Sequence, residues 1–216
     1  MDSLLKIVVP MLEGAEITLQ IFFITLILSV PLGMLFSLAR LSSIKPVRYL
    51  TEVYIWLMRG TPLMLQLLFV YFALPMVGIR LPDIAAALLA FSLNYAAYFA
   101  EIFRAGIQSI DNGQMEAGRS LGLTWFQTMR YIIIPQAFKR VIPPLGNEFI
   151  ALLKDSSLVS VIGFEELTRR GQLVIARTYA SLEIWFCVAI IYLVMTLSIS
   201  RFVAYLERRY QVDDRN

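Results

Sequence analysis

Four long segments of the sequence contain no Asp, Glu, Lys or Arg, and they restrict the folds that this chain can adopt. The segments cover residues 17–39, 60–79, 84–100 and 184–200. A helix that crosses the hydrocarbon core of a bilayer needs ~20 mostly apolar residues, and ~17–25 are sufficient. All four segments fall in that range, and only 16% of the residues are charged, against roughly 25% in soluble domains. We therefore predict an all-α integral membrane protein.

The sequence accommodates five transmembrane helices in one domain covering residues 1–216. The expected spans are about 17–39, 50–75, 84–105, 136–162 and 183–204. The fourth span is unusually polar, because Pro143, Pro144, Glu148, Lys154 and Asp155 all lie within it. Such a helix must face protein or water rather than lipid. We expect the prolines to loosen it and to direct freed carbonyl groups towards a cavity.

Basic residues are divided unequally between the two sides of the membrane. If the N-terminus lies outside, twelve Lys and Arg residues fall on the cytoplasmic side and five on the outer side. Loops rich in Lys and Arg stay in the cytoplasm. The distribution predicts an outside N-terminus and a cytoplasmic C-terminus.

The longest cytoplasmic connection, about 106–135, has the pattern of two short helices. Asp111 and Gln114 are spaced as an N-cap and its reciprocal partner at N3. A helix starting there can end before Gly122, because glycine is the preferred residue just beyond a helix C-terminus.

Thr124 and Gln127 repeat the capping spacing, and we expect the second helix to end at Pro135. Its apolar stripe consists of Trp125, Met129 and Ile132 or Ile133. The connection is predicted to be a helix–turn–helix that either docks a cytoplasmic partner or stabilises the inner ends of the spans.

Residues 116–135, EAGRSLGLTWFQTMRYIIIP, resemble the EAA loop of ABC importer permeases. That loop reads E-A-A, three residues, Gly, nine residues, Ile, one residue, Leu, Pro. Five positions match, namely Glu116, Ala117, Gly122, Ile132 and Pro135. Gly118 replaces the second alanine and Ile134 replaces the leucine.

Two further segments resemble the polar amino acid branch of these permeases. They are residues 59–66, RGTPLMLQ, and residues 135–158, PQAFKRVIPPLGNEFIALLKDSSL. The resemblance covers about 15–210. It implies the type I ABC importer permease fold, the bacterial cytoplasmic membrane, and import of a polar amino acid by alternating access.

The resemblance also implies partners. They are two ABC ATPase subunits that bind ATP and Mg, a second permease subunit (the same chain or a related one), and an extracytoplasmic amino-acid-binding protein. Coupling to the ATPase is implied for Glu116, Ala117, Gly118 and Gly122. The chain has no G-x-x-x-x-G-K-[ST] phosphate loop, so we expect no catalytic residue, metal or cofactor of its own.

The strongest candidates for substrate contact are two acids in the fourth span. Glu148 and Asp155 are seven residues apart and therefore share one helix face. Ser157 offers a hydroxyl beside them. The structural alternative is that Lys154, Arg59 or Arg104 pairs with these acids and only holds the helices together.

The second and third spans supply further polar candidates. Thr61 and Gln66 flank a break at Pro62, where they can contact substrate or satisfy amides freed by the proline. Asn94 and Tyr98, followed by Glu101, form a polar stripe that can line a path or bond between helices.

Two intramembrane acids suit a basic amino acid such as arginine, lysine or histidine, with glutamine or glutamate as the alternative. An intramembrane enzyme is disfavoured, because the chain has no histidine, a single cysteine (Cys187) and no hydrolase motif. An ion channel would need a filter, which the sequence does not show. No nucleic-acid partner is expected.

Overall fold

The computed structural model describes residues 2–210, apart from the side chains of residues 2–6, and those residues form helices joined by short connections, with no β-strand among them. The side chain of Lys6 and all of Arg215, which enter the charge count above, lie outside this description. The elements are α1 (Asp2–Arg40), α2 (Lys45–Gly60), α3 (Leu63–Leu68), η1 (Phe69–Ala73), η2 (Leu74–Val77), α4 (Asp83–Gln108), α5 (Asn112–Ser120), α6 (Trp125–Thr128), η3 (Met129–Ile133), α7 (Ile134–Asp155), η4 (Ser156–Ile162), α8 (Leu167–Thr178) and α9 (Ser181–Arg209). The all-α prediction is confirmed.

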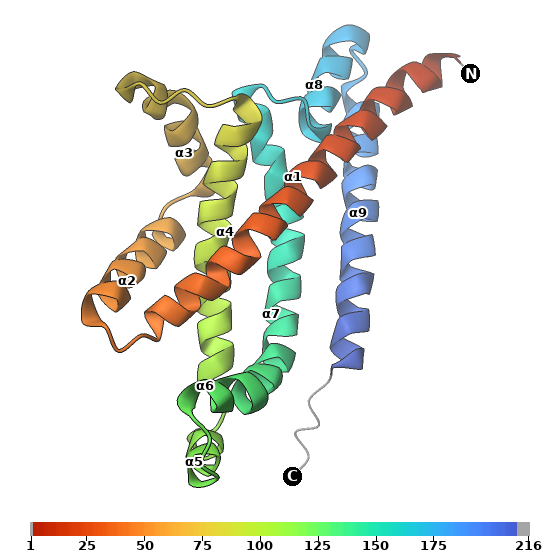
Figure 1. Ribbon diagram of the computed structural model, residues 1–216. Coiled ribbons are helices and arrows are strands. Elements are labelled where there is room, and N and C mark those ends of the chain that lie inside the picture. Colours follow the sequence, from red (N-terminus) through yellow and green to blue (C-terminus); the bar gives the residue numbers. More distant parts are fainter. Residues whose placement is uncertain (1, 211–216) are drawn as a thin grey trace.

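Three helices of the described chain, α1, α4 and α9, are long and apolar enough to cross a bilayer. Helix α2 and the segment Leu63–Val77 pass the same test only together, as a pair bent by 104° that forms either a broken span or a re-entrant loop. Helix α7 is too polar for that test but runs alongside α4 and α9 (Figure 1). The five predicted spans therefore correspond to α1, the bent α2–α3 unit, α4, α7 with η4, and α9.

Helix α1 crosses α4 obliquely, and this is its most extensive contact (Figure 1). Small residues allow the close approach. A Cβ atom on Gly33 would lie 2.6 Å from Cβ of Phe99 and 3.0 Å from the carbonyl oxygen of Ala96. The predicted close-packing alanines of α4 are all buried, namely Ala86, Ala90, Ala97 and Ala100. Close packing of small residues is the usual basis of helix association in membranes.

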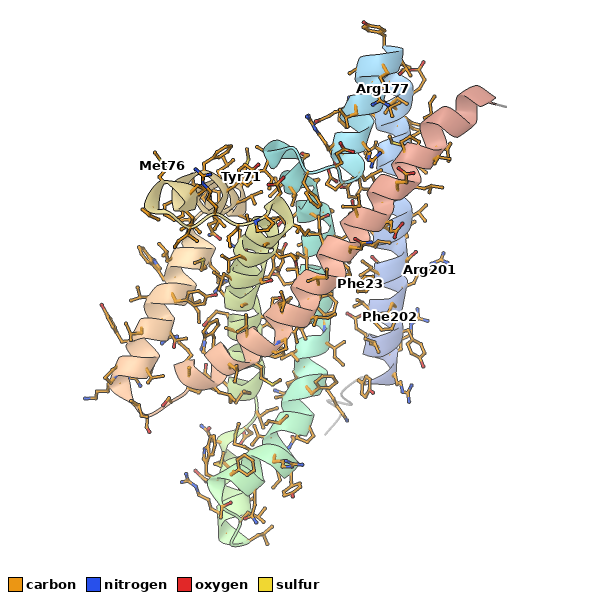
Figure 2. The ribbon with its side chains drawn as sticks, turned by 45° about the horizontal axis from the view of Figure 1, so that its top comes forward. Phe23, Tyr71, Met76, Arg177, Arg201 and Phe202 are labelled. Carbon is orange, nitrogen blue, oxygen red and sulfur yellow. The ribbon has the colours of Figure 1, made fainter. Side chains whose placement is uncertain are left out.

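One main apolar core joins α1, α4, α7, α8 and α9. Phe22 of α1 and Phe99 of α4 are almost completely buried in it, and Phe99 packs edge-on against Phe149 of α7 with ring centroids 6.0 Å apart. The opposite faces of α1 and α9 leave large apolar side chains uncovered, such as Phe23 and Phe202, exposed by 55% and 58% (Figure 2). In water such a surface would be unfavourable, so these faces are suited to lipid.

One expectation about proline is wrong. Pro135 does not end a helix, because α6, η3 and α7 follow one another without a break. The turn before it is a π-turn, in which the amide of Ile134 donates to the carbonyl of Met129. This wider turn accommodates a proline ring that an α-turn would exclude. Pro143 and Pro144 lie inside α7, which continues past them to Asp155.

The α1–α4 crossing generates a stability prediction. Gly33→Ala should lower the melting temperature of the purified protein, because the added methyl group overpacks the contact with Phe99 at a cost of about 1–3 kcal/mol. Gly60→Ala is the matched control, since a Cβ atom there would meet nothing within 4 Å. Thermal unfolding in detergent measures both variants, and equal melting temperatures would contradict the packing argument.

Candidate functional site

Two cavities lie one above the other between α2, α4 and α7. The upper cavity, on the side of α3 and α8 in Figure 1, encloses about 820 Å³, open solvent included. Its lining is Arg59, Gly60, Thr61, Pro62, Leu63, Asn94, Tyr95, Tyr98, Glu148, Ala151 and Asp155. The lower cavity, on the side of α5 and α6, encloses about 880 Å³. Its lining is Arg59, Tyr98, Glu101, Ile102, Arg104, Ala105, Gly106, Ser109, Arg140, Pro144 and Glu148.

The upper cavity brings together most of the residues that the sequence suggested for substrate contact. Five of the seven line it, from α4, α7 and the break between α2 and α3: Thr61, Asn94, Tyr98, Glu148 and Asp155. The other two lie outside its lining. Oε1 of Gln66 accepts a hydrogen bond from Nδ2 of Asn94 at 3.0 Å, and the hydroxyl of Ser157 donates to the carbonyl oxygen of Lys154 at 2.8 Å.

The break between α2 and α3 is stabilised by two side-chain amides. Pro62 has no N–H, so the carbonyl oxygen of Met58 lacks its usual helical donor. Nε2 of Gln66 and Nδ2 of Asn94 both donate to that oxygen at 2.9 Å. Nδ2 of Asn94 also lies 3.0 Å from Oε1 of Gln66, and Nε2 of Gln66 lies 2.7 Å from Oγ1 of Thr61. The structural role proposed for Gln66 at the proline is therefore present, although the unpaired group is a carbonyl.

Asp155 has a partner that the sequence reasoning missed. The hydroxyl of Tyr95 donates to Oδ2 of Asp155 at 2.8 Å, which links α4 to the end of α7. Tyr95 is almost completely buried and also lines the upper cavity. The available signal was a tyrosine next to Asn94 in an otherwise apolar span, because a buried Tyr hydroxyl normally has a partner.

The structural alternative for the two acids of α7 was an ion pair with Arg59, Arg104 or Lys154. Among the described residues, neither Glu148 nor Asp155 forms an ion pair with Arg59, Arg104 or Lys154. Glu148 borders both cavities, and Asp155 borders the upper one. Their predicted position on one face of the helix is confirmed.

A separate ion pair within α4 borders the lower cavity. Arg104 donates to Glu101 through Nε at 3.0 Å and through Nη2 at 2.6 Å. Arg59 approaches the same carboxylate less closely, with 3.9 Å between Nη1 and Oε2. Its guanidinium carbon lies 5.2 Å from the centre of the Tyr98 ring. Of the expected stripe, Asn94 lines the upper cavity, Glu101 lines the lower one and Tyr98 borders both.

The predicted helix–turn–helix is present as α5 and α6, at the lower end of the molecule (Figure 1). Asp111 caps α5 by accepting from the amide of Gly113 at 2.6 Å. The expected reciprocal hydrogen bond, from the amide of Asp111 to the side chain of Gln114, is not among the bonds of this cap. Oε1 of Gln114 accepts from Nε2 of Gln136 at 3.4 Å instead. Thr124 and Gln127 form the full capping box that their spacing predicted.

The turn between α5 and α6 depends on a glycine with positive φ. Gly122 has φ +79°, its amide donates to the carbonyl of Arg119, and the amide of Leu123 donates to the carbonyl of Gly118. This is the Schellman pattern, which favours glycine at that position. Gly118 is buried, and a Cβ atom there would lie 2.7 Å from both Cγ2 and Oγ1 of Thr128.

The outer face of this hairpin is exposed and partly apolar. Glu116 and Ala117 are accessible, as are Leu121, Trp125 and Phe126, exposed by 78%, 54% and 64%. The predicted apolar stripe is therefore divided. Met129 and Ile133 are buried within a small core, whereas Trp125 stays on the surface.

One buried acid lies outside both cavities. Glu166 caps α8, accepting from the amides of Thr168 and Arg169 at 2.9 and 2.8 Å, and from the Tyr192 hydroxyl at 2.9 Å. Burial raises the pKa of the Glu166 carboxyl, and the two amide bonds oppose that change. Thr18 of α1 approaches the same carboxylate at 3.4 Å, so this group ties α8 to α1 and α9.

The structure thus combines apolar helices long enough to cross a bilayer, polar cavities between the helices and an exposed capped hairpin at one end. The family of binding-protein-dependent transport system inner membrane components matches residues 29–212. The chain belongs to this family, and it is a permease subunit rather than an enzyme.

Two curated relatives are similar over almost their whole length. The glutamine transport system permease protein GlnP of Escherichia coli (strain K12) is 43% identical over 207 residues, covering 94% of both chains. The arginine transport system permease protein ArtQ of Bacillus subtilis (strain 168) is 41% identical over 204 residues, covering 94% of this chain and 93% of ArtQ.

Solved structures agree with the fold. A chain of a crystal structure described as an amino acid ABC transporter with histidines superimposes with a TM-score of 0.91 at 45% identity, covering 96% of this chain and 97% of the other. An inward-facing MetNI methionine ABC transporter gives a TM-score of 0.72 at 19% identity, covering 95% and 96%, which shows the shared type I importer fold.

The contact between Gly118 and Thr128 generates a prediction in which a second substitution should restore the stability lost through the first. Gly118→Ala should lower the melting temperature, because the new methyl group meets Thr128; overpacking of this kind costs about 1–3 kcal/mol. Thr128→Ala removes both obstructing atoms, so the double variant should regain most of the loss. Gly122→Ala is the control, because its cost arises from positive φ and Thr128→Ala should not relieve it. A double variant no more stable than Gly118→Ala would contradict the proposed contact.

Proposed function

We propose that this chain is the permease subunit of an ATP-driven importer for a polar amino acid, and that the upper cavity is its substrate site. The observation that carries the proposal is the pair of acids, Glu148 and Asp155, facing a cavity at membrane depth without an ion-pair partner among the described residues. An intramembrane charge is energetically costly and normally has a partner or a function. Family membership and the relatives named above support the amino acid substrate class.

The chemistry of the cavity suits a zwitterionic amino acid with a further positive charge. The two carboxylates can accept from an α-ammonium group and from a basic side chain, and the guanidinium of Arg59 can bind an α-carboxylate. Arginine, lysine and histidine fit this distribution of charge. Glutamine is the second candidate, because Asn94 and Thr61 supply uncharged donors and acceptors in the same lining, and because one of the relatives is a glutamine permease.

The α5–α6 hairpin is proposed to couple the permease to an ATPase. Its exposed apolar residues, beside Glu116 and Ala117, form a surface that suits a groove on a partner protein. The assembly we infer contains two ATPase subunits that bind ATP and Mg, a second permease chain that is identical or related, and an extracytoplasmic amino-acid-binding protein.

The orientation we propose places this hairpin in the cytoplasm of a bacterial cell. The lower end then carries the cytoplasmic excess of Lys and Arg, in agreement with the positive-inside rule. Helix α1 begins at the upper end and α9 ends at the lower end (Figure 1), as an N-terminus outside and a C-terminus inside require.

The function is tested by co-expressing the chain with an amino acid importer ATPase and reconstituting the complex in liposomes. We expect ATP hydrolysis to be stimulated by arginine supplied on the outer side of the permease. Glu148→Gln and Asp155→Asn should each raise the half-maximal arginine concentration roughly 10- to 150-fold, the equivalent of the about 1.5–3 kcal/mol contributed by a charged hydrogen bond.

Glu16→Gln is the matched control, because Glu16 is an exposed acid of α1 outside both cavity linings. Stimulation by glutamine alone would retain the permease and exclude selectivity for basic amino acids. Failure to assemble with any such ATPase, together with solute flux in its absence, would contradict the proposal and favour a channel.

A further inference from the structure

The upper and lower cavities share three lining residues. Arg59 from α2, Tyr98 from α4 and Glu148 from α7 border both spaces. The three residues therefore lie where the two cavities adjoin, and the Arg59 guanidinium there lies 5.2 Å from the centre of the Tyr98 ring. Any solute that passes from one cavity to the other must pass this level.

Arg59 is held at this level by weak contacts. Within the described part of the chain its ion-pair contact is the 3.9 Å approach to Glu101, and its guanidinium lies over the Tyr98 ring. Glu101 is already bound by Arg104 through two shorter hydrogen bonds. The long side chain of Arg59 is 44% exposed, so it can leave its position without breaking a buried network.

There is space for such a movement. A third, open cavity of about 670 Å³, solvent space included, lies between α1, α2 and α4, and Arg59 borders it together with Arg40, Glu52, Trp56 and Glu101. In addition, Arg59 is the penultimate residue of α2, next to the 104° bend. A change in that bend would move its side chain relative to α4 and α7.

The charge of Arg59 is also suited to a barrier. Acids surround the path at three heights, with Asp155 above, Glu148 between the cavities and Glu101 below. Such a series attracts small cations and could conduct them. A guanidinium stays charged at every physiological pH and repels cations at a constriction.

We propose that the Arg59 side chain, seated between Tyr98 and Glu101, is the barrier that closes the path between the upper and lower cavities. The inference rests on the proposed function, since it treats the two cavities as one translocation path. Its test does not require transport activity, so the failure of either proposal can be recognised separately.

The experiment uses the full chain in membrane vesicles and two cysteine reporters. Cys187 is the only cysteine of the chain, so Cys187→Ser gives a clean background. Ala151→Cys reports from the upper cavity alone, and Ala105→Cys reports from the lower cavity alone. A membrane-impermeant thiol reagent is applied to each face in turn, without ATP.

With Arg59 present, we expect each reporter to be modified from one face only. Arg59→Ala should abolish this protection, so that both reporters react from both faces, and it should also increase the passive leak of a monovalent cation. Because Arg59 is half exposed, the substitution is compatible with folding; Arg59→Ser is the second variant, and size-exclusion chromatography checks both.

Arg40→Ala is the matched control. Arg40 binds Glu52 through two hydrogen bonds of 2.9 and 2.7 Å but borders neither the upper nor the lower cavity, so its loss should leave one-face labelling unchanged. One-face labelling that survives Arg59→Ala and Arg59→Ser would overturn the proposal. So would labelling of either reporter from both faces while Arg59 is present, or loss of protection in Arg40→Ala.

Discussion

The carbonyl oxygen of Met58 has no backbone donor, because the residue four positions later is Pro62. Inside a membrane protein such a group must be satisfied by protein, since lipid offers no hydrogen bond. Gln66 and Asn94 supply the two donors, and the sharp bend between α2 and α3 can then exist at membrane depth. The bend carries Thr61 and Pro62 to the wall of the upper cavity and positions Arg59 between the two cavities. The positions of these lining residues therefore depend on the two hydrogen bonds that satisfy the Met58 carbonyl.

The arrangement of charge along the path follows from helix geometry. Glu148 and Asp155 share a face of α7 because they are two turns apart, and both face α4 across the upper cavity. Their environments differ, however. The hydroxyl of Tyr95 fixes Asp155, whereas Glu148 borders the same two cavities as Arg59. If the upper cavity binds substrate as proposed, the fixed Asp155 carboxylate can orient the ligand. The less constrained Glu148 carboxylate can then follow the ligand towards the lower cavity.

Much of this organisation could be predicted from the sequence. Runs without charge located the apolar spans, the spacing of Thr124 and Gln127 gave a real capping box, and the seven-residue spacing placed both acids on one face. Contacts between distant segments could not be predicted. The Tyr95–Asp155 bond joins residues 60 positions apart, and the burial of Glu166 depends on Thr18 and Tyr192 from two other helices. Local pattern carries no information about such neighbours.

The wrong expectation at Pro135 has a mechanical consequence. A helix ending there would have joined the coupling hairpin to the fourth span by a flexible loop. Instead, α6, η3 and α7 follow one another without a gap from Trp125, three residues after Gly122, to Asp155. If the hairpin couples the permease to an ATPase as proposed, a displacement of the hairpin would reach Glu148 and Asp155 through continuous helix rather than through a loop. The π-turn at Met129–Ile133 is the place where this element can change direction, because its hydrogen bonding departs from that of the helices on either side.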